Sequence, residues 1–140
     1  MTAIARDALG NTATSAPVPV TLNNQIGFAQ SAASVPQTAQ STVTAVFGAA
    51  QTAANLDVVV VGWNDSVAKV QSVTDTQGNS YTLAVGPTVV SGFASQAIYF
   101  AKNIVAAAPG TNTLTIRFDR AAQYVDLRIH ERNKRERDSG

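Results

Sequence analysis

The sequence contains no cysteine, and this absence removes several kinds of chemistry at once. Without thiols the chain forms no disulfide, offers no thiolate nucleophile and supplies no cysteine ligand to zinc. It also lacks any apolar run of about 18 residues, so we expect no membrane-spanning segment. Its first residues, MTAIARDALG, do not contain the continuous apolar core of a signal peptide. If the protein is exported, we expect its signal to lie upstream of this sequence.

Charged side chains are also scarce: they make up 14% of the residues, against about a quarter in typical soluble domains. Residues 1–127 carry five basic and six acidic side chains and are nearly neutral. A nearly neutral body argues against a nucleic-acid groove, because phosphates require a basic surface. Residues 128–140 hold five basic and three acidic side chains. We predict that residues 132–140 form a charged, solvated tail.

A six-residue turn motif occurs twice, as DALGNT at residues 7–12 and as DTQGNS at residues 75–80. Both copies have the form D-x-x-G-N-S/T, and a β-prone run follows each. Glycine adopts positive φ without steric cost, while Asp and Asn side chains bond to nearby backbone. The motif therefore predicts two tight connections between strands, and we expect the strands that flank the second copy to pair as a hairpin.

Short β-prone runs fill most of the remaining sequence. The strongest is LDVVVVGW at residues 56–63, whose consecutive valines predict a central strand covered on both faces. The last, QYVDLRIH at residues 123–130, alternates polar and apolar residues. Further strands are expected near residues 3–10, 12–22, 26–29, 42–47, 67–74, 80–85, 95–101 and 112–118. About eight to ten short strands predict an all-β, two-sheet antiparallel β-sandwich of jelly-roll or Ig-like type, with a barrel as the alternative.

Two parts of the sequence resemble known bacterial modules. The segment DALGNTATSAPVPVTLNN, at residues 7–24, resembles the closing hairpin of bacterial Ig-like surface repeats. The stretches LDVVVVGWNDS, VQSVTDTQGNSYTLAVGP, QAIYFAKNIVAAAPGTNTLTIRF and YVDLRIHE, within residues 56–131, resemble a β-sandwich module of large bacterial surface and secreted proteins. The resemblance implies an extracellular or cell-surface location within a larger exported protein. It divides the chain into residues 1–24, 25–131 and 132–140, and it transfers no catalytic motif.

A tryptophan followed by two polar residues marks the end of the strongest strand. An indole at a strand end can stack on a sugar ring while neighbouring polar groups bind its hydroxyls, so Trp63, Asn64 and Asp65 are candidate carbohydrate ligands. Tyr81 and Tyr99 are candidates for an aromatic platform that binds a carbohydrate or surface polymer. The alternative is structural: Trp63 is a core tryptophan, Asn64 and Asp65 form a turn, and the tyrosine rings pack inside.

Residues near the predicted turns carry the oxygen ligands that calcium prefers, which makes calcium the candidate cofactor. The candidate metal ligands are Asp65, Asp75, Asn79 and Asp119. Their spacing does not match an EF-hand loop, and Asp and Asn also favour turns for backbone reasons alone. His130, the single histidine, is the candidate base of a hydrolase. Asp126 on the same strand face lies about 13 Å from it, and the sequence contains no G-x-S-x-G motif. We assign no catalytic residue.

These observations favour a non-catalytic module that serves carbohydrate binding, adhesion or spacing in a larger bacterial surface or secreted protein. The alternative is a small hydrolase that acts on a glycoside, ester or lactone with the assistance of calcium. A third interpretation is purely structural. Exposed edge strands invite pairing with another chain, so we also expect homo-oligomers formed through edge strands.

Overall fold

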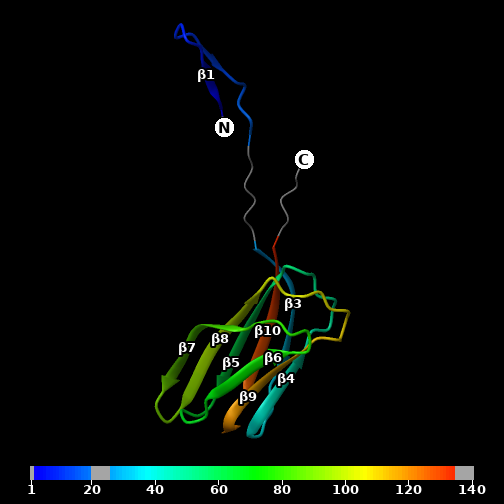
Figure 1. Cartoon of the computed structure of the whole chain (residues 1–140). Coiled ribbons are helices and arrows are strands. Elements are labelled where there is room, and N and C mark those ends of the chain that lie inside the picture. Colours follow the sequence, from blue (N-terminus) through cyan, green and yellow to red (C-terminus); the bar gives the residue numbers. More distant parts are fainter. Residues whose placement is uncertain (1, 20–25, 135–140) are drawn as a thin grey trace. The chain divides into compact units, whose positions relative to one another are not determined.

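The computed structural model describes residues 2–19 and 26–134, and these residues form an all-β structure without helices (Figure 1). Ten strands make three antiparallel sheets, which confirms the predicted all-β, sandwich-like class. In this part of the chain, no helix able to cross a membrane is found. The strands are β1 (Ile4–Arg6), β2 (Thr12–Thr14), β3 (Ile26–Ser34), β4 (Gln40–Val46), β5 (Leu56–Trp63), β6 (Val70–Asp75), β7 (Thr82–Val90), β8 (Ala94–Lys102), β9 (Thr113–Ala122) and β10 (Asp126–Lys134).

The chain divides into two compact units, and the smaller one contains the hairpin of β1 and β2. β2 is shorter than the run predicted at residues 12–22, of which residues 20–22 lie outside the described range. Pro17 and Pro19 follow it and lack the N–H that a paired strand needs. All side chains of residues 2–19 are exposed. A two-stranded hairpin gains little from burial, so its turn is the main local source of order.

The larger unit, Ile26–Lys134, is a sandwich of two sheets stacked face to face (Figure 1). One sheet has five strands in the order β3-β10-β5-β8-β7, and the other has three in the order β4-β9-β6. β5 is central, as its valine run predicts. Its inward residues Val59 and Val61 are fully buried, whereas Val58 and Val60 on the outer face are partly exposed. The prediction that both faces are covered is therefore wrong for the outer face within this unit.

The core is formed by alternating residues that point inward from both sheets. On β10 the predicted alternation is confirmed: Leu127 and Ile129 are buried, while Asp126 and Arg128 form an ion pair outside the core. The three-stranded sheet contributes Leu114, Ile116, Phe118 and Val43 to the same core, and Phe47 joins it from the position directly after β4. Each large apolar side chain buried in this way contributes about 1.5–3 kcal/mol to folding.

The strands that flank the second turn motif do not pair with each other. β6 pairs with β9 in the three-stranded sheet, and β7 pairs with β8 in the five-stranded sheet. The segment from Asp75 to Thr82 therefore crosses from one sheet to the other. The predicted hairpin is wrong because the motif fixes only the local turn, whereas strand pairing depends on which sheet buries the apolar face.

The two turn motifs nevertheless have the same internal hydrogen bonds. Asp7 Oδ1 accepts the backbone N–H groups of Leu9 and Asn11, and Asp7 Oδ2 accepts the Asn11 side-chain amide at 2.8 Å. Asp75 binds the backbone N–H groups of Gln77 and Asn79 and the Asn79 side-chain amide in the same way. The glycine of each copy has positive φ, at 90° and 75°. This confirms that the motif encodes a tight turn.

β10 extends beyond the predicted end of the sandwich at residue 131. Arg132, Asn133 and Lys134 pair with Phe28, Gly27 and Ile26 of β3. The guanidinium of Arg132 lies 5.5 Å from the centre of the Phe28 ring, a cation–π contact that stabilises this end of the strand. The first three residues of the predicted solvated tail therefore belong to the sheet. Residues 135–140 of the predicted tail lie outside the described range.

Candidate functional site

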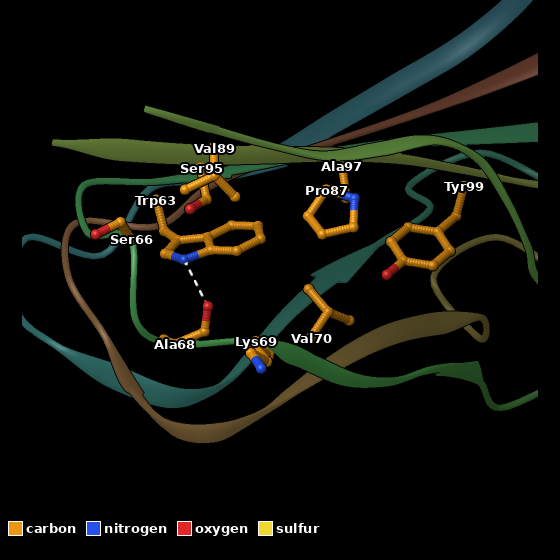
Figure 2. Close-up of a pocket in the computed structure, with 10 residues that line it drawn as sticks. All are labelled: Trp63, Ser66, Ala68, Lys69, Val70, Pro87, Val89, Ser95, Ala97 and Tyr99. Carbon is orange, nitrogen blue, oxygen red and sulfur yellow. Dashed lines mark hydrogen bonds between the residues drawn. The ribbon is translucent and has the colours of Figure 1, made fainter. Parts of the chain in front are cut away.

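An apolar groove opens between the two sheets, where β6 is the edge of one sheet and β7 is the edge of the other. It has a volume of about 220 Å³. Ten residues from β5, β6, β7, β8 and the β5–β6 loop line it (Figure 2), chiefly Trp63, Lys69, Val70, Pro87, Val89 and Tyr99. We call this site the β6–β7 groove. Ligand pockets are typically about 300–1,000 Å³, so this one suits a single small ring or side chain.

Trp63 forms one wall of the β6–β7 groove and belongs to the core as well. It is 3% exposed, and its ring packs edge-on against Phe118 with 5.3 Å between the ring centres. Its indole N–H donates to the carbonyl of Ala68 at 3.1 Å, the hydrogen bond drawn in Figure 2. These contacts hold the ring in the core. Trp63 is therefore a core tryptophan, as the structural interpretation has it, and only a small part of its ring borders the groove.

Tyr99 lines the same groove from β8 (Figure 2). Its ring is partly buried, and burial raises the pKa of its hydroxyl. Within the described residues that hydroxyl has no hydrogen-bond partner, which leaves it available to a ligand. The structure thus brings together two of the five residues predicted to bind carbohydrate, Trp63 and Tyr99.

Asn64 and Asp65 do not line the groove but shape the loop beside it. The backbone N–H of Asn64 donates to Gln123, and the Asp65 carboxylate accepts the backbone N–H groups of Val67, Ala68 and Gln123. Burial acts to raise the pKa of Asp65, but these hydrogen bonds outweigh burial and lower it. Asp65 therefore holds the wall that contains Ala68 and Lys69.

Tyr81, the fifth predicted carbohydrate ligand, lies away from the groove in a buried set of polar side chains. Its hydroxyl is 3.2 Å from Asp57 Oδ2 and 2.9 Å from Asp75 Oδ2. Gln51 donates to both oxygens of Asp57, and Asn112 donates to the side-chain carbonyl of Gln51 and to Asp75 Oδ2. The five side chains close a ring of hydrogen bonds that joins the two sheets. We call it the polar network.

The polar network contains two carboxyl groups whose pKa values are shifted in opposite directions. Burial is the main cause that raises the pKa of Asp57 to about 7, and the charges of Glu131 and Asp75 contribute to the rise. Burial also acts to raise the pKa of Asp75, but hydrogen bonds from Asn112, Asn79 and Tyr81 outweigh it and lower that pKa. Burial and the neighbouring acids raise the pKa of Tyr81. Near neutral pH, Asp57 is therefore the group that exchanges a proton.

Glu131 is a further buried acid beside the polar network. It is 1% exposed and pairs directly with Asp57 across β10 and β5. Its carboxylate accepts the Thr52 backbone N–H and the side-chain amides of Asn55 and Gln30, two of them at 2.6 Å. Three donors satisfy it without a cation, which agrees with the rule that buried charges require hydrogen bonds.

Asp57 and Glu131 were absent from the candidate site residues, although the sequence contains a signal for them. In β5, Asp57 alternates in step with Val59, Val61 and Trp63 and so lies on the same face of the strand. In β10, Glu131 lies on the same face as Ile129. Strict alternation places both acids on the inward face. Gln51 and Asn112 lie outside the strands, so alternation does not reveal them.

The four predicted metal ligands form two separate pairs. Asp75 and Asn79 share the second turn, while Asp65 and Asp119 bind the backbone N–H groups of the adjacent residues Ala68 and Lys69. The pairs lie at opposite ends of β6, which spans about 17 Å. Among the described residues, no group of three or more His, Asp or Glu side chains is placed to hold one metal ion.

His130 lies on β10, where it pairs with Val58 and Ser31. It lies on the same face of the strand as Arg128, which is the outer face of the five-stranded sheet, and it is partly exposed. Asp126 on the same face is paired with Arg128 instead. The structure therefore does not join His130 and Asp126 into a catalytic pair.

Comparisons with protein-family models, with curated proteins and with solved structures find no match to this chain. Function is therefore inferred from the β6–β7 groove and the polar network. The groove is open to solvent, and apolar and aromatic side chains make up most of its lining. The polar network is internally satisfied, and its members Asp57, Gln51 and Asn112 are buried. Of the two, the groove is the site that can receive a ligand.

Proposed function

We propose that this chain is a non-catalytic, exported bacterial β-sandwich module that binds carbohydrate through the β6–β7 groove. The observation that carries the proposal is an open groove walled by the Trp63 indole and the Tyr99 ring. The C–H face of a sugar ring is apolar enough to pack on such walls, while its hydroxyls face outward to water or to polar groups at the rim. The resemblance to bacterial surface modules supports the same context.

The dimensions of the groove favour a single sugar residue over a long chain segment. At about 220 Å³ it accommodates one ring beside Pro87 and Val70, which lie between Trp63 at one end of the groove and Tyr99 at the other (Figure 2). A polymer would then bind through one inserted residue or one chain end. Repetition of such weak sites along a larger surface protein would increase avidity, which suits a role in adhesion.

The hydrolase alternative receives less support from the same groove. A glycosidase requires carboxyl groups on either side of the bond that is cleaved. None of the ten residues that line the groove is acidic. Asp57, Asp75 and Glu131 instead accept hydrogen bonds from neighbouring side chains and backbone groups. Binding without turnover is therefore the function that we propose.

The proposal is tested by a ¹H–¹⁵N NMR titration of the full chain with a panel of neutral and acidic oligosaccharides. We expect shifts at the backbone amides of the β5–β6 loop, β7 and β8, and an affinity reduced about fivefold or more in Tyr99→Ala, since the aromatic contact is lost. Phe28→Ala removes another exposed ring, on β3, and should bind as the wild type does. Absence of shifts in the groove with every sugar would overturn the proposal and favour a spacer.

A further inference from the structure

The β6–β7 groove contains one charged side chain, Lys69, among its ten lining residues. Lys69 is exposed at the start of the groove wall, next to Ala68 and Val70 (Figure 2). In the part of the chain that the structure describes, no carboxylate lies within ion-pair distance of its ammonium. A single charge at the rim of an apolar pocket is the kind of group that fixes the orientation and specificity of a ligand.

The acid nearest to Lys69 in the structure is already engaged. Asp119 accepts the backbone N–H of Lys69 at 2.9 Å, and its other oxygen lies 3.6 Å from the guanidinium of Arg120. The hydrogen bond from the Lys69 backbone N–H is the main cause that lowers the pKa of Asp119. The positive charges of Arg120 and Lys69 lower it further. Arg120 therefore shares the negative charge of Asp119, and the exposed ammonium of Lys69 lies beside the groove without a close carboxylate among the described residues.

The remaining polar groups of the groove point to the same ligand chemistry. The indole N–H of Trp63 and the hydroxyl proton of Ser95 are donated to backbone carbonyls, and the Ser66 oxygen accepts the backbone N–H of Gly92. The side-chain groups left for a ligand are the Lys69 ammonium, the Tyr99 hydroxyl and the proton of Ser66. Ammonium groups only donate, and both hydroxyls retain a donor.

A donor-rich rim around an apolar pocket suits a ligand that is rich in acceptors and negatively charged. We propose that the β6–β7 groove binds a ring that carries a carboxylate, such as a uronic-acid residue of an acidic polysaccharide, with Lys69 as the group that binds the carboxylate. The ring packs on the apolar wall of the groove near Val70 and Pro87, and its carboxylate accepts from the ammonium. This inference rests on the proposed function and deepens it by naming the class of sugar.

The test compares two ligands that differ in charge but share one ring. The full chain is titrated with sodium glucuronate and with glucuronamide, its neutral amide, and the ¹H–¹⁵N shifts of the groove residues are followed. We expect glucuronate to bind about two- to fivefold more tightly, as is typical of a partly exposed ion pair. Because salt screens such pairs, added NaCl should weaken glucuronate binding and leave glucuronamide binding unchanged.

Two lysine variants complete the test. Lys69→Gln should bind the two ligands equally, while Lys102→Gln, which makes the same change of charge at the exposed end of β8, should keep the preference. Equal binding of both ligands by the wild type, or a preference retained in Lys69→Gln, overturns the role of Lys69 and leaves carbohydrate binding in place. If neither ligand nor any oligosaccharide shifts the groove, both the inference and the proposed function are overturned.

Discussion

Titration of Asp57 should make the domain less stable as the pH rises from 5 to 8. The geometry at Tyr81 explains why. Its hydroxyl lies within hydrogen-bond distance of both Asp57 and Asp75, yet it has one proton and can donate to only one of them. Amide donors from Asn112 and Asn79 hold Asp75 in its charged form. A protonated Asp57 can donate to the Tyr81 oxygen, whereas an ionised Asp57 competes with Asp75 for the single hydroxyl proton.

The magnitude follows from the pKa of Asp57 in the two states. Burial raises that pKa from 3.8 to about 7 in the folded protein. Between these values the folded state binds one proton more than the unfolded state, so the free energy of unfolding falls by about 1.4 kcal/mol per pH unit. The stabilisation is complete below the unfolded pKa and is lost as the pH rises through the folded pKa. We expect a loss of about 2–3 kcal/mol between pH 5 and pH 7, then a plateau.

Urea denaturation of the wild type and of Asp57→Asn at several pH values measures this effect. The asparagine amide can donate to Tyr81 as the protonated carboxyl does, and its oxygen can accept from Gln51. The variant should therefore fold and lack the pH-dependent loss, and at pH 8 it should be at least as stable as the wild type. Equal slopes in the two proteins would refute the reasoning. So would a pKa near 4 for Asp57 by carboxyl ¹³C NMR in the wild type.

Two further substitutions test other parts of the fold. Glu131→Gln places an amide N–H₂ among three donors, so we expect a loss of about 1–3 kcal/mol in the free energy of urea unfolding; a loss below 0.5 kcal/mol would show that the carboxylate is not needed. Gly78→Ala puts a side chain at φ +75° without a steric contact, so backbone strain alone should cost about 1–2 kcal/mol. Gly48→Ala, where the added methyl group also meets nothing and φ is not in the left-handed region, is its control, and equal stability of the two variants would contradict the assignment of strain.

Local patterns predicted those parts of the fold that depend on neighbours in the sequence. The valine run placed β5 at the centre of a sheet, the alternation of residues 123–130 predicted the buried face of β10, and both D-x-x-G-N motifs form the expected turn. The partner of β6 was not predictable in this way. A turn motif specifies how the chain reverses, whereas pairing with β9 depends on a strand about 40 residues away.

The candidate site was predicted in part for the same reason. Trp63 was identified as an aromatic residue at a strand end and Tyr99 as part of an aromatic platform, but the groove that both line exists because β6 and β7 are edges of different sheets. No local pattern contains that relation. Lys69 was not singled out because a lone lysine is usually a solvated surface residue. Its candidate role in binding follows only from its position beside the apolar walls of the groove.

One inward face of β5 connects the two sites. Asp57 begins this face in the polar network, Val59 and Val61 continue it through the core, and Trp63 ends it at the β6–β7 groove, about 20 Å from Asp57. Apolar contacts are non-directional, so on their own they would allow two sheets to close over an empty groove. Hydrogen bonds from Gln51, Asn112 and Tyr81 require particular distances between the sheets. These hydrogen bonds therefore fix the separation of the two sheets at the Asp57 end of this face, whereas at the Trp63 end the sheets meet through apolar contacts such as that of Trp63 with Phe118.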